Sequence, residues 1–197
     1  MKLLKFAGVA LVAAMLLAGC KDASTPAAAP AKEAATRTPV TTAAIEAEAK
    51  GFIVGSPMAT RTVYVFFDPQ CPHCAVLWQS AKPLKNQAKF VWIPIAFSGE
   101  TGLAQGATIL AAADPVAKME ENEVSILAKG GGITAASGVD AQKEQVRKNT
   151  ALLTRMGFES VPSTVALHAQ TGQLVTAEGS MPTADLAARL GLQVPAQ

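Results

Sequence analysis

The chain has 197 residues, of which 50% are hydrophobic and 16% are charged. This composition excludes an intrinsically disordered chain, and the length allows one domain with an additional segment but not two full-sized domains. The formal net charge is +2, and without Lys2 and Lys5 of the leader described below, 17 − 2 = 15 basic residues balance 15 acidic ones. We therefore expect no nucleic-acid partner, and three cysteines are too few for a disulfide-stapled miniprotein.

The first 20 residues have the pattern of a bacterial lipoprotein leader. Two lysines precede an uncharged run from residue 6 to residue 18, a length typical of a signal peptide and short of the about 20 residues that a transmembrane helix needs. The motif Leu17-Ala18-Gly19-Cys20 resembles the lipobox. This resemblance implies that residues 1–19 are a signal peptide and that Cys20 becomes the lipidated first residue of the mature chain. The alternative is an ordinary secretory leader followed by a stray cysteine.

The segment after the leader has the composition of a linker. Residues 21–43 consist mainly of Ala, Pro and Thr and contain a single large apolar side chain, Val40. Proline interrupts helices and such a composition cannot build a core, so we expect a solvated segment. The predicted organisation is a signal peptide (1–19), a lipid-attached flexible linker (20–43) and one folded domain (44–197).

The folded domain is expected to alternate strands and helices. The segment Thr62–Phe67 is apolar nearly throughout, so it is predicted to be a central strand buried on both faces. The next helix begins at Pro72, where a missing N–H is tolerated, and Pro83 is expected to kink it. Asp140 is expected to cap a later helix.

The predicted order of elements defines the fold class. It comprises a helix over 44–50 capped by Thr41 or Thr42, strands over 52–54 and 62–67, a helix over 72–87, a strand over 90–97, a helical region broken at Asp114-Pro115 and Gly130-Gly131-Gly132, a helix over 140–156, a hairpin of strands over 163–168 and 173–176, and a helix over 184–190. This order predicts an α/β fold with a mixed central sheet flanked by helices.

The chemistry of the chain is concentrated in Cys71-Pro72-His73-Cys74, directly after the predicted central strand. A strand, a turn and a helix that opens with CxxC form a specific redox context. Cys71 at the helix start faces unpaired N–H groups and the positive end of the helix dipole, which favour the thiolate and lower the thiol pKa. Cys74 lies one turn further on the same side, within reach of a disulfide with Cys71. His73 adds positive charge near the sulfur, and a lower thiol pKa makes the disulfide a stronger oxidant.

This region resembles the thioredoxin superfamily, and in particular the catalytic domain of the periplasmic DsbC/DsbG-type thiol:disulfide interchange proteins. Members carry an aspartate three residues before the first cysteine and an aromatic residue soon after the second, and Asp68 and Trp78 match these positions. They also place a cis-proline opposite the cysteines, and Val161-Pro162 before a predicted strand fits this feature. The resemblance covers about residues 50–192 and implies a thioredoxin-like fold, with a helical insertion between the CxxC helix and the cis-proline strand.

The resemblance also implies the roles of individual residues. Cys71 is the catalytic nucleophile, Cys74 resolves the mixed disulfide, and Pro72 and His73 tune the thiol pKa. Val161-Pro162 holds the substrate backbone beside the active sulfur. The implied activity is reduction or isomerisation of disulfides in exported proteins, with electrons from a membrane partner similar to DsbD, without a cofactor and without a metal.

Three departures from the DsbC/DsbG pattern keep other roles open. Pro72-His73 and Val161 look more like the oxidase DsbA, so an oxidase served by a partner similar to DsbB is the alternative. The segment between residue 44 and the motif strand is too short for the N-terminal dimerisation domain of these proteins, so a monomer is expected. Many thioredoxin-like proteins carry a buried acid six residues before the first cysteine. Here that position is Val65, so water or another group serves Cys74, or its deprotonation is slow.

The cysteine pair also allows metal-binding, structural and non-catalytic roles. Two thiolates suit Cu(I), so a periplasmic copper-binding chaperone is a less favoured alternative. Tetrahedral zinc needs four ligands, and only His73 and His168 are further candidates. A structural disulfide would close a tiny loop and add little stability. A non-catalytic binding module would have no need of the intact CxxC pair.

Several further residues have plain structural interpretations. His168 is expected to be a partly exposed strand residue, Asp68 a turn or capping residue, and Trp78 a core residue. Three acidic residues of the helical insertion are interpreted as the solvated face of a helix: Glu120, Glu121 and Glu123.

The predicted location is the periplasmic side of a bacterial membrane, where lipidated Cys20 anchors the domain in the bilayer. Lys21 stands where an aspartate commonly signals inner-membrane retention, which favours the outer membrane. The expected partners are therefore the lipid bilayer and the thiols or disulfides of exported proteins.

Overall fold

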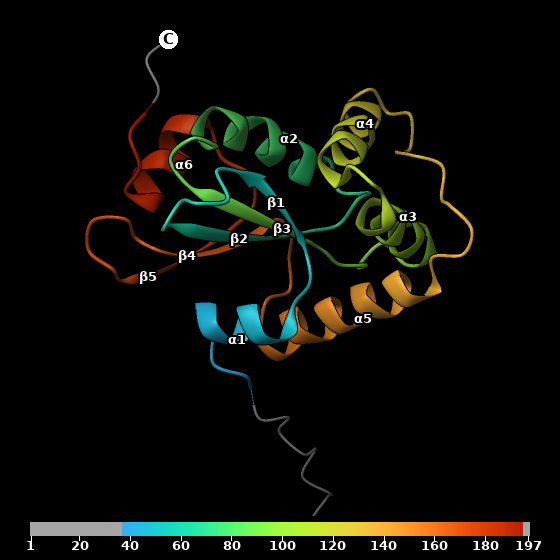
Figure 1. Ribbon diagram of the computed structural model, residues 1–197, viewed down its shortest axis with the longest axis horizontal. Coiled ribbons are helices and arrows are strands. Elements are labelled where there is room, and N and C mark those ends of the chain that lie inside the picture. Colours follow the sequence, from blue (N-terminus) through green and yellow to red (C-terminus); the bar gives the residue numbers. More distant parts are fainter. Residues whose placement is uncertain (1–36, 195–197) are drawn as a thin grey trace, which may run out of the picture. The chain divides into compact units, whose positions relative to one another are not determined.

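The computed structural model describes residues 37–194, which form the predicted α/β fold (Figure 1). In chain order they contain α1 (Thr42–Glu48), β1 (Phe52–Gly55), β2 (Thr62–Phe67), α2 (Pro72–Ala81), a short 3₁₀ helix η1 (Lys82–Leu84), β3 (Lys89–Pro94), α3 (Glu100–Ala111), α4 (Pro115–Leu127), α5 (Asp140–Arg155), β4 (Ser163–Leu167), β5 (Leu174–Glu178) and α6 (Thr183–Leu190). The predicted signal peptide and Cys20 lie outside the described residues. Among residues 37–194, no helix has both the length and the hydropathy needed to cross a membrane.

The described strands form one mixed sheet in the order β1-β3-β2-β4-β5. Strand β2 pairs in parallel with β3, whereas the pairs β1–β3, β2–β4 and β4–β5 are antiparallel. Every residue of β2 after Thr62 is buried, as predicted for a strand covered on both faces. Because β2 is central and leads directly into the loop before Cys71, the cysteine motif lies at the carboxyl end of the middle of the sheet.

Helices cover both faces of the sheet (Figure 1). On the face under α2 and α6, Val65 and Phe67 belong to the same buried apolar cluster as Cys74. On the opposite face, covered by α1 and α5, Phe66 packs with Ile45 and further apolar side chains. Successive side chains of a strand point to opposite faces, so alternate residues of β2 contribute to two separate cores. The first of these cores holds Cys74 between α2 and the sheet.

The helices α3 and α4 form the predicted insertion between the cysteine helix and the cis-proline strand. Helix α3 packs against α5, and α4 packs against α2. The Asp114 side chain caps α4 by accepting a hydrogen bond from the backbone N–H of Ala117 at 3.0 Å, and Pro115 is the first helical residue. Met119 of α4 belongs to the same apolar cluster as Cys74. The insertion therefore extends the wall that covers the α2 side of the sheet.

Three details at helix ends bear on the prediction. Thr41 caps α1 through its side chain, so one of the two expected caps is confirmed. Pro83 lies in η1 rather than at a kink in a longer α-helix, because proline lacks the N–H that would continue the i→i−4 ladder. The predicted cap Asp140 is wrong: Val139 is the N-cap without a side-chain hydrogen bond, and Asp140 is the first helical residue. There its carboxylate still lies at the positive end of the helix dipole.

The chain packs against the domain within the last residues of the predicted linker. The backbone N–H of Thr38 donates to the carbonyl oxygen of Arg155 at 3.0 Å, and Val40 packs against the apolar cluster on the α1 side. The described contacts therefore begin before the predicted domain boundary at residue 44.

Candidate active site

The cysteine motif occupies the first turn of α2. Cys71 is the N-cap and Pro72 follows at the first helical position. The backbone N–H of Cys71 donates to the carbonyl oxygen of Asp68 at 2.9 Å, which closes the turn between β2 and the helix. Both cysteines are free thiols, but Cys71 is partly exposed whereas Cys74 is completely buried. One sulfur is therefore open to a partner molecule, and the other is reached only through the first.

The thiol pKa of Cys71 is lowered to about 6. The largest cause is a hydrogen bond from the Cys74 thiol, which stabilises a charge on the Cys71 sulfur. The backbone N–H groups of Cys74 and His73 and the positive charge of His73 lower the pKa further, while partial burial opposes them. Cys71 is therefore largely a thiolate at neutral pH, which is the reactive form of a cysteine.

The thiol pKa of Cys74 is raised well above its ordinary value. Burial is the largest cause, because a thiolate loses its hydration in the apolar core. The hydrogen bond to Cys71 and the negative charges of Cys71 and Glu123 raise this pKa further. The site therefore holds one ionised and one neutral thiol side by side.

The loop before β4 brings the predicted substrate-binding residues to the exposed cysteine. The peptide bond between Val161 and Pro162 is cis. The carbonyl oxygen of Val161 lies 3.6 Å from the Cys71 sulfur, although the two residues are 90 positions apart in the chain. His73 reaches the loop between β5 and α6, where its Nδ1 lies 3.4 Å from the Ser180 hydroxyl. The fold thus assembles Cys71, His73 and Val161-Pro162 at the carboxyl end of the central strand β2.

Asp68 is a turn residue, as the sequence predicted. Its carboxylate is buried and accepts hydrogen bonds from the backbone N–H of Gln70 at 2.9 Å and from the hydroxyl of Ser98 at 2.6 Å. The backbone N–H of Ser98 donates to the other carboxylate oxygen at 2.7 Å. Asp68 therefore ties the cysteine loop to the loop after β3.

A second anchor of the cysteine loop was not predicted from the sequence. The Gln70 side chain, next to Cys71, donates to the side-chain oxygen of Gln105 on α3 and to the carbonyl oxygen of Gly131 at 2.8 Å. The Gln105 amide donates to Gly131 and Ile133 carbonyl oxygens, each at 2.9 Å. The triple-glycine loop is therefore fastened beside the reactive cysteine. Only the position of Gln70 in the motif could have drawn attention to it.

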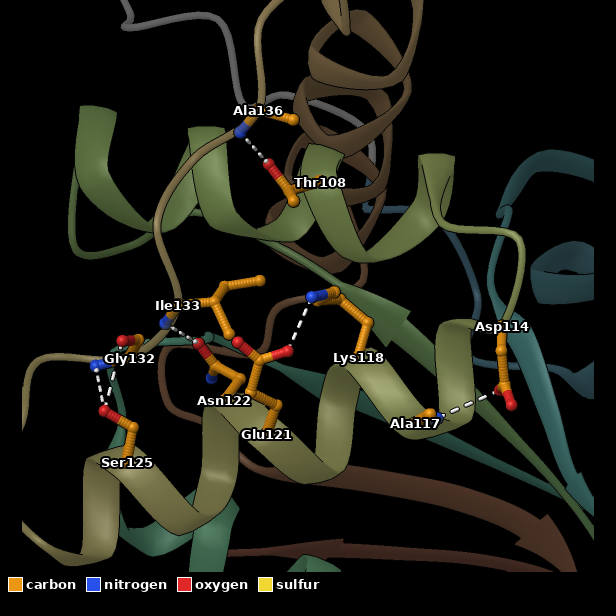
Figure 2. Close-up of polar contacts among 10 residues, drawn as sticks. All are labelled: Thr108, Asp114, Ala117, Lys118, Glu121, Asn122, Ser125, Gly132, Ile133 and Ala136. Carbon is orange, nitrogen blue, oxygen red and sulfur yellow. Dashed lines mark hydrogen bonds and ion pairs between the residues drawn. The ribbon is translucent and has the colours of Figure 1, made fainter.

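The helix α4 is fastened to the same loop by its polar side chains (Figure 2). The backbone N–H of Ile133 donates to the Asn122 side-chain oxygen at 3.1 Å, and Ser125 exchanges hydrogen bonds of 3.1 Å with the Gly132 backbone. The Asn122 amide also donates to the carbonyl oxygen of Pro69 at 2.8 Å. Asn122 is completely buried and thus links α4 to the loop that carries Cys71.

The interpretation of the three glutamates as a solvated face is wrong for Glu123. Glu121 is exposed, whereas Glu123 is completely buried. The sequence does contain a signal for this, because the buried residues Met119, Asn122, Glu123 and Ile126 follow the i, i+3, i+4, i+7 spacing of one helix face. The polar identity of two of these residues hid the stripe.

Trp78 lies as expected, whereas His168 has the expected partial exposure but lies outside the strand. Trp78 is buried in the core, and its ring N–H donates to the Glu120 carboxylate at 2.6 Å. His168 is partly exposed just after β4, and its Nδ1 accepts hydrogen bonds of 3.3 Å from the backbone N–H groups of Gln170 and Thr171. Across residues 37–194, no three His, Cys, Asp or Glu side chains gather as a group of potential metal ligands.

The fold and the sequence together define the protein class. Residues 56–193 match the family described as a thioredoxin-like domain. The chain therefore belongs to the thioredoxin-like domain family, and its mixed sheet flanked by helices is the thioredoxin-like fold.

The resemblance to DsbG-type proteins is also confirmed. The thiol:disulfide interchange protein DsbG of Pseudomonas aeruginosa is 29% identical over 140 residues, which cover 70% of this chain and 54% of that protein. DsbG of Escherichia coli is 29% identical over 114 residues, which cover 55% of this chain and 44% of that protein. The chain thus spans about half the length of these curated relatives.

A solved structure shows the same fold at lower sequence identity. A periplasmic thioredoxin-like protein from Salmonella enterica serovar Typhimurium superposes with a TM-score of 0.59 at 18% identity, over 78% of this chain and 97% of that one.

The lowered pKa predicts the pH at which Cys71 becomes reactive. In the chain carrying Cys20→Ser, we expect the rate of Cys71 alkylation by iodoacetamide to rise with pH, with a midpoint near pH 6. Peptide mass spectrometry measures this rate. Buried Cys74 should stay unmodified in the folded protein. Cys74→Ala removes the largest cause of the shift and should move the midpoint upward. A wild-type midpoint near pH 8.5, about that of a free thiol, would contradict the lowered pKa of Cys71.

Proposed function

We propose that this protein is a thiol:disulfide oxidoreductase that reduces or isomerises disulfides of exported proteins through Cys71 and Cys74. The observation that carries the proposal is the partly exposed Cys71 sulfur with a pKa of about 6, placed 3.6 Å from the Val161 carbonyl. A reactive thiolate can attack a sulfur of the substrate, and a free backbone carbonyl beside it can bind the extended substrate chain that carries this sulfur. The DsbG relatives, which are named thiol:disulfide interchange proteins, support the same reaction class.

The first step is nucleophilic attack on a substrate disulfide. The Cys71 thiolate bonds to one substrate sulfur, and the other leaves as a thiolate, so one S–S bond forms as another breaks. The Val161-Pro162 loop would hold the backbone of the attacked cysteine beside Cys71. Because Cys74 is buried, the substrate meets only the first sulfur.

The second step decides between reduction and isomerisation. For reduction, Cys74 loses its proton and attacks the Cys71 sulfur, which forms the Cys71–Cys74 disulfide and releases the second substrate thiolate. Two electrons pass from the protein to the substrate, and a membrane donor similar to DsbD would restore the dithiol. For isomerisation, another substrate thiolate attacks the mixed disulfide and frees Cys71 unchanged.

A disulfide oxidase is the alternative direction for the same site. The lowered Cys71 pKa stabilises the reduced protein and so makes its disulfide more oxidising. Pro72-His73 and Val161, which look like those of DsbA, favour this direction, and a partner similar to DsbB would then reoxidise the pair. We favour reduction or isomerisation because the DsbG resemblance extends over most of the folded chain.

We also propose that the domain works in the periplasm, tethered through lipidated Cys20, with the outer membrane as the favoured location. A leader of signal-peptide length followed by Leu17-Ala18-Gly19-Cys20 supports the tether. The monomeric state expected from the sequence stays a prediction.

The two cysteines should be separable by substitution. Cys71→Ser should abolish the reduction of a peptide disulfide, because the nucleophile is lost. Cys74→Ser should still attack but should accumulate mixed disulfides, because the resolving thiol is lost. Non-reducing gels and mass spectrometry of the adducts measure both. Full thiol-exchange activity in Cys71→Ser would rule out the assignment.

The reduction potential should decide the direction of electron flow. With a Cys71 pKa of about 6, we expect a value between the about −270 mV of thioredoxin and the about −120 mV of DsbA. Equilibration in glutathione buffers with thiol trapping gives this value. A potential close to that of DsbA would favour the oxidase alternative. The absence of any reversible Cys71–Cys74 disulfide would contradict the proposal and favour a copper chaperone.

Lipid attachment should depend on a single residue. In cells, the wild-type protein should fractionate with membranes and carry acyl groups on Cys20, whereas Cys20→Ala should be recovered without them. Mass spectrometry of the N-terminal peptide, together with fractionation on a density gradient, tests both the anchor and the membrane. An unacylated N-terminus in the wild-type protein would contradict the tether.

A further inference from the structure

The α4 helix carries a buried carboxyl group that the mechanism above does not use. Glu123 is completely buried, and its Oε1 accepts one long hydrogen bond of 3.3 Å from the neighbouring Asn122 amide. Its Oε2 is buried without any hydrogen-bond partner. A carboxylate in such surroundings is costly, so buried acids of this kind are commonly functional.

The packing of α4 against α2 places this carboxyl group at the resolving cysteine. Glu120 accepts hydrogen bonds from Trp78 on α2 and from Lys82 at the start of η1, each at 2.6 Å. Moving forward along α4, Asn122 contacts Pro69, which precedes the cysteine motif. The two helices therefore run antiparallel along this contact. One turn beyond Glu120 on α4 is Glu123, and one turn before Trp78 on α2 is Cys74. Both residues are completely buried, so we infer that they lie on the facing sides of the two helices.

The charges in the site agree with this placement. The pKa of Glu123 is raised to about 8, first by burial and then by the negative charges of Cys71, Asp68 and Glu120, against the lowering effect of the Asn122 hydrogen bond. In turn, the charge of Glu123 is among the causes that raise the pKa of Cys74. The titratable groups whose charges act on Glu123 are thus Cys71 at the start of α2, Asp68 in the loop before it and Glu120 on its own helix, and Glu123 acts in turn on Cys74.

Two other buried polar atoms without a partner lie on the same side of the sheet. They are the ring nitrogen of Trp92 and the hydroxyl of Thr164, and both residues pair with Val65 in the sheet register. Val65 packs with Cys74, so these side chains line the same layer. Among the three unpartnered groups of the described residues, only the Glu123 carboxylate accepts a proton near neutral pH.

We propose that Glu123 is the proton acceptor for Cys74 when the mixed disulfide is resolved, and the proton donor when the Cys71–Cys74 disulfide is reduced. This inference rests on the proposed thiol–disulfide exchange. The helical insertion would then supply the acidic group for proton transfer that many thioredoxin-like proteins carry at the strand position occupied here by Val65.

The resolving step moves one proton and breaks one S–S bond as another forms. In the mixed disulfide, the Cys74 S–H proton passes to the Glu123 carboxylate, and the Cys74 electron pair attacks the Cys71 sulfur. The Cys71–Cys74 bond forms, the bond from Cys71 to the substrate sulfur breaks, and the substrate leaves as a thiolate. In the reverse direction an incoming thiolate attacks Cys71, and Cys74 leaves and takes the proton from the Glu123 carboxylic acid.

The test separates the two steps in single turnovers. Reduced full-length chain carrying Cys20→Ser is mixed with glutathione disulfide, quenched in acid at set times and analysed by mass spectrometry for the protein–glutathione adduct and the internal disulfide. Glu123→Gln is compared with the matched control Glu121→Gln, an exposed glutamate on the same helix that pairs with Lys118. The series is repeated across pH.

We expect Glu123→Gln to form the adduct at about the wild-type rate but to resolve it about 100-fold more slowly at pH 7, the lower limit of typical general acid–base effects. The adduct should accumulate, and the resolution rate should keep rising with pH where the wild-type rate has levelled off. Glu121→Gln should match the wild-type protein in both steps.

Other outcomes overturn the inference. Resolution by Glu123→Gln at the wild-type rate and with the wild-type pH profile removes the proton-transfer role. Equal slowing of both steps shows a merely structural role. If the wild-type protein forms no adduct and no internal disulfide, the proposed function fails, and the inference fails with it.

Thermal unfolding across pH provides a readout of the folded state. The pKa of Glu123 is raised from 4.5 to about 8 in the folded protein. The stability that this side chain contributes, compared with glutamine at the same position, is therefore complete below pH 4.5 and is lost as pH rises through 8. Glu123→Gln should therefore melt at least as high as the wild type above pH 8. A lower melting temperature of the variant there would contradict the desolvated carboxyl group.

Discussion

The hydrogen bond from the Cys74 thiol to the Cys71 sulfur is the interaction on which the rest of the site depends. It is the largest cause of the lowered Cys71 pKa, and it also helps to keep the proton on Cys74. It forms because the N-cap position exposes the first sulfur while the first turn of α2 carries the second into the core. The apolar cluster under α2 therefore acts on the reaction by holding Cys74 neutral and close to its partner.

The fold divides the work between a scaffold and an insertion. The scaffold, made of β2, α2 and the Val161-Pro162 loop, brings together a sulfur and the backbone that would present a substrate. The insertion contributes the surroundings: Gln70 is fastened to α3 and to Gly131, and Asn122 of α4 holds the loop at Pro69. Each of these contacts ends within two residues of Cys71. Changes in the insertion are therefore expected to act on the cysteines without touching them.

The elements that could be predicted from the sequence are those whose signal is local. The central strand Thr62–Phe67 was predicted with its exact ends because an apolar, β-branched run bounded by turn residues has few other solutions. The cysteine helix and the hairpin of β4 and β5 carried equally local signals. The Val161-Pro162 loop was placed at the active sulfur only through the family resemblance, since nothing local links residues 90 positions apart.

The residues that escaped prediction owe their environment to tertiary packing. Glutamate is usually exposed to solvent, and Glu123 is buried only because α4 packs on α2. The same holds for Gln70, whose partners come from α3 and from a loop about sixty residues away. Asp140 shows the converse. Its high capping preference predicts it as the N-cap, but the helix starts one residue earlier than such a cap implies, and Asp140 is its first helical residue. Hydrogen-bond partners of polar side chains are set by the fold, and composition carries little record of them.

The side chains of Cys71, Cys74 and Glu123 are electrostatically coupled, and the position of their negative charge changes during the reaction. With pKa values of about 6 for Cys71 and about 8 for Glu123, the reduced site at neutral pH holds its charge mainly on the Cys71 sulfur. That charge is one of the causes that keep Glu123 protonated. Once Cys71 is bonded to a substrate sulfur the charge is gone, so the pKa of Glu123 must fall. The carboxyl group is thus ionised, and able to accept a proton, at the stage when Cys74 has to lose its own, and the same electrostatic coupling that poises the nucleophile prepares the resolving step.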